Sequence, residues 1–270
     1  MSAVDDRESR STTIDKAEAG AILEVEQLSK RFGGVQALDG VDFAAWPGQV
    51  VALVGDNGAG KSTLVKSISG IHAPDSGRIR LEGEEVVLRH PSDAARLGIA
   101  TVYQDLALCD NLDVVANLYL GREARMLNRG LDEAAMEAHA SSVLGELSVR
   151  IPNLRVPVGM LSGGQRQAIA VTRSVMWDAK VLLLDEPTAA LGVEQTQQVL
   201  DLVLRLRERN LAVVIISHSL ADVFAVADRI SVLRLGRRVA DVSPRQVTHE
   251  NVVALITGAI RASDLEGSTP

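Results

Sequence analysis

The feature that most constrains the fold is a glycine-rich segment in the first quarter of the chain. Residues 55–63 read Gly-Asp-Asn-Gly-Ala-Gly-Lys-Ser-Thr and satisfy the pattern G-x-x-x-x-G-K-[ST]. Glycines let the backbone curl so tightly that consecutive N–H groups point toward an anion. An apolar run at residues 50–54 precedes the segment and a helical pattern begins near Lys61, so the positive end of the helix dipole faces the loop. The segment is therefore predicted to be a phosphate-binding loop between a strand and a helix.

Two polar motifs follow in the middle of the chain. Gln104 lies in the string Val-Tyr-Gln-Asp, and residues 161–165 read Leu-Ser-Gly-Gly-Gln. Taken alone, Gln104 is an ordinary polar residue, and Ser162 predicts no more than the cap of a helix over residues 166–176.

Two apolar runs later in the chain end in charged or titratable side chains. The run at 181–184 is followed by Asp185 and Glu186, and the run at 213–216 is followed by a serine and His218. A carboxylate at the end of a buried strand is costly without a cation to compensate it, so Asp185 is predicted to serve a metal. A structural ion pair for Glu186 and a satisfied polar group for His218 are the alternatives.

These motifs, in this order, resemble the ATP-binding cassette (ABC) family over about residues 22–260. The resemblance implies an α/β fold: a P-loop NTPase core with an antiparallel β lobe and a small α-helical lobe, together the ABC nucleotide-binding domain. It implies that ATP and Mg²⁺ are bound and that ATP is hydrolysed. The predicted organisation is a flexible polar leader at 1–20, a single ABC ATPase domain at 21–260 with its helical lobe at about 105–165, and a flexible tail at 261–270.

Composition excludes several other classes of protein. The 270 residues are 46% hydrophobic, enough for a substantial core. The longest apolar runs, such as residues 211–216, are far shorter than the roughly 20 residues that span a bilayer, and the polar leader lacks the apolar core of a signal peptide. A net charge of −7 and 3% aromatic residues argue against a nucleic-acid-binding face. The single cysteine, Cys109, excludes an internal disulfide.

The hydrophobic pattern predicts the order of the elements. Alternating segments at 23–28 and 37–45 predict antiparallel strands, and residues 79–81 and 86–88 predict a hairpin through Glu-Gly-Glu at 82–84. Helical patterns from about 112 to 147 predict the separate helical lobe. The buried runs at 181–184 and 213–216, separated by a helix at 194–210, predict a parallel sheet. A terminal hairpin is expected at 230–241.

The loop motif itself assigns the phosphate contacts. Lys61 is expected to reach the β- and γ-phosphates, Ser62 to bind Mg²⁺ through its hydroxyl, and Thr63 with the loop amides to hold the other phosphate oxygens. Phe32 is similar to the family's adenine-stacking aromatic residue, with core packing as the alternative. The predicted nucleotide-binding residues are Phe32, Gly55, Asp56, Asn57, Gly58, Ala59, Gly60, Lys61, Ser62, Thr63, Ser162, Gly163, Gly164 and Gln165.

The resemblance also implies the hydrolytic roles. Glu186 would polarise the attacking water as general base, His218 would contact the γ-phosphate, and Gln104 would contact the metal and the water while linking the core to the helical lobe. With Lys61, these are the predicted catalytic residues. Ser62, Gln104 and Asp185 are the predicted metal ligands.

The Leu-Ser-Gly-Gly-Gln signature implies a second copy of the chain. In the family it closes over ATP held by another cassette, so Ser162 and Gly164 would bind the partner's γ-phosphate. A symmetric homodimer is the economical inference, and a heterodimer is the alternative. One departure concerns the loop at 189–192, Ala-Ala-Leu-Gly, where the family usually has Ser-Ala-Leu-Asp. Gly192 puts the coupling of the two sites in doubt, whereas hydrolysis is expected to survive.

Neighbouring residues narrow the branch of the family. Residues 103–123, the Thr-Ala-Ala-Leu-Gly loop at 188–192 and Ile-Thr-Gly at 256–258 resemble cassettes that import monosaccharides such as ribose, xylose and fructose. The resemblance implies a membrane permease docked on the helical lobe, an extracytoplasmic sugar-binding protein acting indirectly, and a peripheral location at the cytoplasmic face of the inner membrane. A lipid, metal or drug substrate, a soluble cassette ATPase and a non-catalytic subunit are the alternatives.

Overall fold

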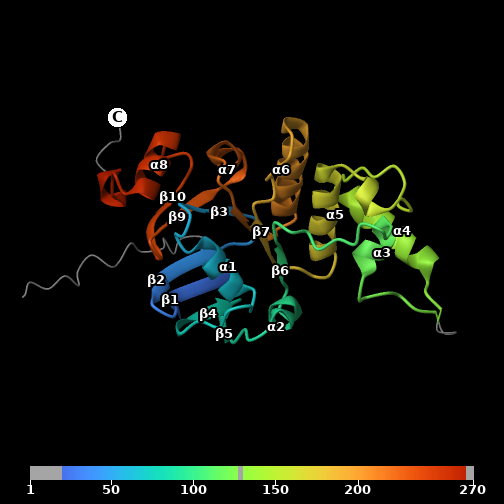
Figure 1. Cartoon of the computed structure of the whole chain (residues 1–270), viewed down its shortest axis with the longest axis horizontal. Coiled ribbons are helices and arrows are strands. Elements are labelled where there is room, and N and C mark those ends of the chain that lie inside the picture. The colour runs from blue at the N-terminus through green and yellow to red at the C-terminus, as the bar shows by residue number, and fades with distance from the viewer. Residues whose placement is uncertain (1–19, 127–129, 266–270) are drawn as a thin grey trace, which may run out of the picture.

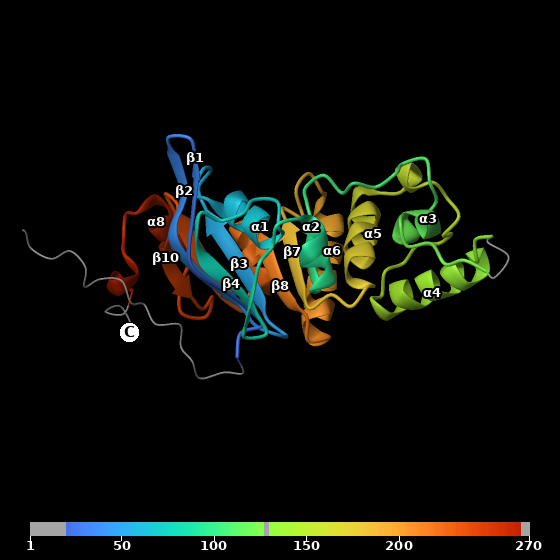
Figure 2. The same ribbon diagram turned by 90° about the horizontal axis from the view of Figure 1, so that it is seen from below.

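The computed structural model describes residues 20–126 and 130–265 of the chain. An antiparallel sheet lies toward one end of an elongated molecule, two helices of a separate lobe lie at the other end, and a mainly parallel sheet lies between them (Figures 1 and 2). The polar leader lies outside the described residues except for Gly20. This arrangement agrees with the fold class predicted from the motifs.

The central sheet places the ends of its strands along one edge. Among the described residues its order is β10-β9-β3-β8-β7-β6, and all neighbours are parallel except the β9–β10 hairpin. Because the carboxyl ends of parallel strands meet at the same edge, the residues that follow β3, β8 and β7 come together there. The strands are β3 (Val50–Gly55), β6 (Ile99–Val102), β7 (Val181–Asp185), β8 (Ala212–Ile216), β9 (Arg229–Arg234) and β10 (Arg237–Val242).

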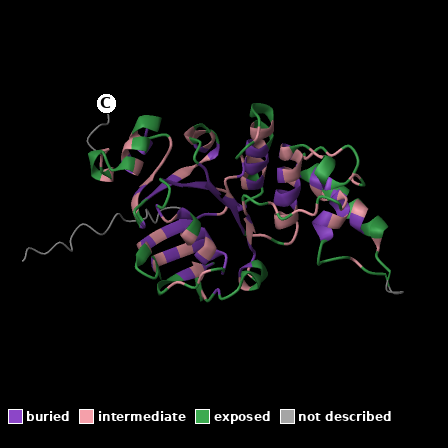
Figure 3. Ribbon diagram, in the orientation of Figure 1, coloured by how far each residue is buried: buried purple, intermediate pink, exposed green. Residues whose placement is uncertain are grey.

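Both faces of this sheet are covered, which explains why its strands are continuous apolar runs. In β3, Val51 and Leu53 belong to one buried cluster, with α1 and the antiparallel sheet, whereas Val50, Ala52 and Val54 belong to a second cluster on the other face. Figure 3 shows the central strands buried between these layers. The covering helices are α1 (Lys61–Ile68) and α2 (Pro91–Arg96) on one face, and α5 (Gly163–Val175), α6 (Val193–Glu208), α7 (Leu220–Val226) and α8 (His249–Thr257) on the other.

The antiparallel sheet has the order β2-β1-β4-β5. Its strands are β1 (Leu23–Phe32), β2 (Val35–Ala45), β4 (Ser76–Leu81) and β5 (Glu84–Val86). The hairpin predicted at 79–88 exists, but the expected pairing of 86–88 is wrong, because Leu81 pairs with Glu84 and Ile79 with Val86. Glu82 and Gly83 have φ values of 53° and 83°, so the loop is a tight two-residue turn that starts β5 earlier than expected.

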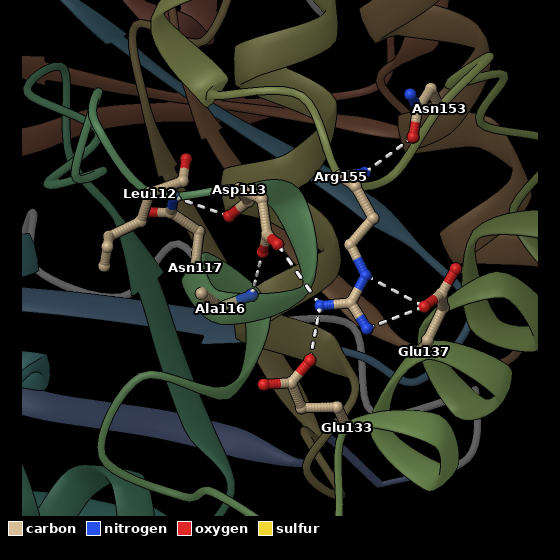
Figure 4. A network of polar contacts seen from close by, with 8 residues as sticks. All are labelled: Leu112, Asp113, Ala116, Asn117, Glu133, Glu137, Asn153 and Arg155. Atoms are coloured by element: carbon tan, nitrogen blue, oxygen red, sulfur yellow. Dashed lines mark hydrogen bonds and ion pairs between the residues drawn. The ribbon is translucent and has the colours of Figure 1, made fainter. Parts of the chain in front are cut away.

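The helical lobe has a hydrophobic core of its own. It is built from α3 (Val114–Tyr119), α4 (Glu133–Glu146) and the adjoining face of α5. Polar contacts fasten the two helices together (Figure 4): the Arg155 guanidinium lies 2.7 Å from Glu137, 3.3 Å from Glu133 and 3.4 Å from Asp113. Asp113 also caps α3 by accepting from the amide of Ala116 at 2.7 Å. One arginine therefore joins the start of α3 to the exposed face of α4.

The end of the described chain is packed rather than free. Residues 262–264 form a 3₁₀ turn, and Leu265 packs against the core cluster that contains α8. Apolar side chains at 260, 262 and 265 contact the core, and the flexible tail expected at 261–270 stays a prediction. Residues 266–270 lie outside the described residues.

Candidate nucleotide-binding and hydrolysis site

The phosphate-binding loop joins β3 to α1, as the sequence predicts, and two of its glycines are required by close contacts. A Cβ on Gly55 would lie 2.3 Å from the carbonyl oxygen of Leu233, and one on Gly60 would lie 2.7 Å from that of Ala37. Gly60 also has a φ of 105°, a conformation that side chains disfavour. The loop is thus pressed against the ends of β2 and β9, and its curvature depends on these two positions.

The ammonium group of Lys61 lies within this loop. It donates hydrogen bonds to the carbonyl oxygens of Gly55 at 2.8 Å and Asp56 at 2.9 Å, and the residue is only 6% exposed. Burial lowers the pKa of Lys61, while the negative charges of Glu186, Asp56 and Asp185 oppose this shift. The lysine charge is therefore near enough to the carboxylates at the end of β7 to be stabilised by them, and it is a cation that the loop offers to a phosphate.

The carboxylates predicted at the end of β7 are in place. Asp185 is the last residue of β7, and burial, followed by the negative charge of Glu186, raises its pKa, while the charges of Lys66, Lys61 and His218 oppose the shift. Glu186 follows with a φ of 51°. A half-buried carboxylate with a raised pKa is an anion that its surroundings do not fully compensate, and a bound cation would compensate it.

Glu186 and His218 are in direct contact. Nε2 of His218 lies 2.7 Å from Oε1 of Glu186, with side chains that are 47% and 27% exposed. The contact arises because β7 and β8 are parallel neighbours, and the amide of Glu186 donates to the carbonyl oxygen of Ile216 at 2.9 Å. An accessible carboxylate held by an imidazole has the geometry to accept a proton from a water molecule.

The predicted metal ligands offer oxygen donors from three elements. Ser62 lies in the first turn of α1, Asp185 ends β7, and Gln104 follows β6, the parallel neighbour of β7. Ser62 and Gln104 are exposed and Asp185 is half-buried. A hydroxyl, a carboxylate and an amide oxygen are the hard ligands that Mg²⁺ takes alongside phosphate and water, so these residues fit the predicted ion.

Phe32 lies at the end of β1 and is 43% exposed. Its ring meets the ring of His72 edge to face at a centroid distance of 5.1 Å, and Nζ of Lys30 lies 5.6 Å from its centroid. At this exposure the ring is not packed into the core, so it is accessible to a base. No motif in the sequence surrounds His72.

The signature residues form the cap that the sequence allows and also pack against α6. Ser162 accepts from the amide of Gln165 at 3.2 Å, and Oε1 of Gln165 accepts from the amide of Ser162 at 3.0 Å. A Cβ on Gly163 would lie 2.8 Å from Cδ2 of Leu191, and one on Gly164 would lie 3.0 Å from Cβ of Gln195. Packing within one chain therefore favours glycine at both positions, because α5 approaches the start of α6 closely.

One chain does not bring every predicted residue into one site. Glu186 and His218 line a pocket of about 600 Å³, whereas Ser162, Gly164 and Gln165 line another pocket of about 700 Å³ beside α6. The signature therefore opens onto a different hollow of this chain from the hydrolytic pair. Its role toward nucleotide, like those of the other predicted site residues, remains a prediction.

Comparison with known proteins assigns the family. The ABC transporter family model matches residues 38–189, more than half of the chain. The chain therefore belongs to the ABC transporter family, as an ATP-binding cassette, and the resemblance found in its motifs is confirmed. No helix in the two described ranges has the length and apolar character needed to cross a bilayer.

Curated relatives narrow the class. The chain is 49% identical to the fructose import ATP-binding protein FrcA of Rhizobium meliloti, over 88% of this chain and 94% of the relative. It is 45% identical to the xylose/arabinose import ATP-binding protein XylG of Sulfolobus acidocaldarius, over 87% and 94%. A ribose import ATP-binding protein RbsA 1 of Rubrobacter xylanophilus is 44% identical, over 82% of this chain and 44% of the relative.

Solved structures agree with the fold. A nucleotide-free ATP-binding cassette of an ABC transporter matches with a TM-score of 0.76 and 27% identity, over 88% of this chain and 96% of the other. The ADP conformation of the cassette MJ1267 matches with a TM-score of 0.76 and 26% identity, over 93% and 100%. Both support the arrangement of core, antiparallel sheet and helical lobe described above.

Proposed function

We propose that this chain is the ATP-hydrolysing subunit that powers import of a monosaccharide through a separate membrane permease. The observation that carries the proposal is the meeting of the phosphate-binding loop with the Glu186–His218 pair at one edge of the parallel sheet. The relatives named above are import ATP-binding proteins for fructose, xylose or arabinose, and ribose. Identity of 49% over nearly the whole length of the fructose relative favours a sugar as the transported molecule.

The residues of the site divide the work of phosphoryl transfer to water. Lys61 and the loop amides bind and orient the phosphates, and Phe32 stacks on the base. Ser62, Asp185 and Gln104 would hold Mg²⁺, which neutralises charge on the phosphates when bound. Glu186 accepts a proton from the attacking water at its carboxylate, and His218 keeps that carboxylate oriented through the 2.7 Å contact.

Two copies of the chain would complete the site. Because Ser162 and Gly164 line a different pocket from Glu186, the signature of one chain would close over ATP on a second copy. Hydrolysis would then depend on dimerisation, and a single chain would bind nucleotide without efficient turnover.

The permease would dock where the helical lobe meets the core. A pocket of about 280 Å³ lies there between α2, β6, α3 and α5, with Arg122, Trp177 and Tyr103 in its lining. The hydroxyl of Tyr103 donates to Oγ of Ser69 at 2.9 Å, so the wall of this pocket is joined to the end of α1. Gln104 follows Tyr103 and would report the state of the nucleotide site to the docked permease.

This assignment also proposes a location and further partners. The cassette would lie at the cytoplasmic face of the membrane, held there by the permease, and an extracytoplasmic sugar-binding protein would deliver the substrate without touching this chain. No nucleic acid is expected as a partner, since the net charge is −7.

ATP hydrolysis is tested with the purified chain and two variants. Wild type should release phosphate from MgATP, Glu186→Gln should bind ATP normally but lose about 10²–10⁴ of the rate, and Lys61→Ala should lose ATP binding. A wild-type rate no higher than that of Glu186→Gln would refute the hydrolytic function.

The transport assignment is tested by purifying the tagged chain from detergent-solubilised native membranes and identifying what accompanies it by mass spectrometry. A polytopic permease is the expected partner, and the binding protein that works with it would then be screened against fructose, xylose, arabinose and ribose. Ribosomes or DNA recovered from a soluble fraction, with no membrane protein, would refute transport, whereas a binding protein specific for a lipid or a metal would refute only the sugar.

A further inference from the structure

A second side-chain contact joins the same two segments that carry Glu186 and His218. The hydroxyl of Thr188 donates to Oδ2 of Asp222 at 2.7 Å. Thr188 lies two residues after Glu186, and Asp222 lies four residues after His218 in the first turn of α7. The segments after β7 and β8 are therefore connected twice, once by the contact of Glu186 with His218 and once by the hydrogen bond of Thr188 to Asp222.

The carboxylate of Asp222 is not used to cap its own helix. In α5 and α8 the side chain at the third helical position, Gln165 or Asn251, accepts from the amide of the cap residue. In α7 the hydroxyl of Ser219 accepts from the amide of Asp222 at 3.3 Å, but the amide of Ser219 donates instead to Oγ of Ser217 at 3.0 Å. This local arrangement leaves the Asp222 carboxylate to bond across to the other segment.

The segment that carries the general base needs such support. Glu186 has a φ of 51°, a left-handed conformation that persists in a non-glycine residue only where the surroundings hold it. Its amide donates to Ile216 at 2.9 Å, and its carbonyl accepts from the amide of Ala189 at 3.1 Å. Thr188 lies inside this short turn, so its bond to Asp222 fastens the turn to α7.

Solvent competes less with the second contact than with the first. His218 is 47% exposed, whereas Thr188 and Asp222 are both half-buried, as Glu186 is, and the bond between them is partly shielded. All four residues line the same pocket of about 600 Å³. A shielded hydrogen bond holds its geometry better than one open to water, so the Thr188–Asp222 contact is suited to set the spacing of the exposed pair.

We propose that Asp222, acting through Thr188, is a positioning residue that keeps Glu186 and His218 aligned for attack of water on ATP. This inference rests on the proposed hydrolytic function. Neither Thr188 nor Asp222 needs to touch the nucleotide. Loss of their bond should therefore slow turnover without weakening ATP binding.

The test compares Thr188→Val, which keeps the shape and removes the hydroxyl, with Thr188→Ser, which keeps the hydroxyl. In steady-state phosphate release, Thr188→Val and Asp222→Ala should each lower kcat about tenfold, with KM within about twofold of wild type. Thr188→Ser and Asp222→Asn should restore most of the rate, and combining Thr188→Val with Asp222→Ala should cost no more than either change alone. Thr257→Val, which removes a hydroxyl bonded only within α8, is the matched control.

A second measurement separates positioning from a general loss of structure. In the Glu186→Gln background, adding Thr188→Val should leave the residual turnover unchanged, because the group being positioned is already gone. An unchanged kcat for Thr188→Val would refute the inference while leaving the proposed function intact. Equal losses of kcat, ATP affinity and thermal stability that Thr188→Ser does not restore would refute it too. A wild-type chain that does not exceed Glu186→Gln would instead refute the proposed function, and the inference with it.

Discussion

Gly60, at the junction of the phosphate-binding loop and α1, offers a quantitative test of how tightly the loop is packed. It has a φ of 105°, and a Cβ there would lie 2.7 Å from the carbonyl oxygen of Ala37 and 2.9 Å from Cδ2 of Leu38. Gly58, two residues earlier, has a φ of 78° but nothing within 4 Å of the same position. Replacing each by alanine therefore separates the cost of the backbone conformation from the cost of the contact.

The two costs can be estimated separately. Alanine in a left-handed conformation loses about 1–2 kcal/mol, of which about 0.4–1 kcal/mol is recovered because the unfolded chain is less flexible. Gly58→Ala should thus lower the free energy of unfolding by about 0.5–1 kcal/mol. At Gly60 the overlap with a backbone carbonyl adds about 1–3 kcal/mol. Gly60→Ala should therefore lose about 1.5–4 kcal/mol in total.

Thermal unfolding of the nucleotide-free chain measures the difference. At about 2–4 °C per kcal/mol for a chain of this size, Gly60→Ala should melt roughly 3–16 °C below wild type and Gly58→Ala within about 4 °C of it. Gly34→Ala, at a glycine without a positive φ and with nothing within 4 Å, is the control and should change little. Equal melting temperatures for the Gly60 and Gly58 variants would refute the claim that the contacts with β2, and not only the backbone conformation, require Gly60.

Three further changes test other parts of the site. Phe32→Ala should weaken ATP binding about tenfold in a fluorescent-nucleotide titration, whereas Phe32→Tyr should not. The reason is that a stacked ring contributes about 0.5–1.5 kcal/mol beyond the burial of its apolar area. Equal affinities of Phe32→Ala and wild type for ATP would rule out stacking. The pKa of Asp185 is raised in the folded chain, so ionising this carboxyl lowers the free energy of unfolding as the pH rises above the ordinary pKa of 3.8. Asp185→Asn should therefore raise the melting temperature at pH 7 and lose that gain as the pH falls toward 4. An equal gain at both pH values would contradict the direction of the pKa shift. Gly192 is the cap residue before α6, with a φ of −74° and no side-chain cap. Gly192→Asp should therefore raise the free energy of unfolding by about a few tenths of a kcal/mol in denaturant titrations and leave ATP hydrolysis intact. Destabilisation would show that the loop has no room for the carboxylate.

Local pattern was sufficient where the side chains form an unbroken apolar run or repeat a period. Continuous apolar runs predicted β7 and β8, alternation predicted β1 and β2, and the helical period predicted α6 within two residues at each end. The elements α2, α7 and β6 were not predicted, because they are short and their apolar residues are interrupted by polar ones before a period repeats. The contacts of Ala262 and Leu265 with the core were also not predicted, because two isolated apolar residues form no pattern.

The chemistry of the site was predicted as a list of residues, not as an arrangement. The pairing of Glu186 with His218 at 2.7 Å follows from β7 and β8 being parallel neighbours, and the motifs implied both residues without implying their contact. The edge-to-face contact of His72 with Phe32 had no sequence signal. Phe32 ends β1 and His72 lies in the loop between α1 and β4, and the fold brings their rings within 5.1 Å.

The sequence by itself determined which side chains are candidates for the chemistry, because glycines at fixed spacing and a lysine suit a phosphate and strand-end carboxylates suit a metal ion. Only the tertiary structure decided how those side chains are held: Glu186 against His218, Gly164 packed against Gln195 of α6, and Thr188 bonded to Asp222. The physical reason is that motif identity is a local property of the chain. Contacts between segments more than 30 residues apart depend instead on which strands become neighbours and on how the helices pack against the sheet. Sequences with the same motifs can form such contacts with different side chains.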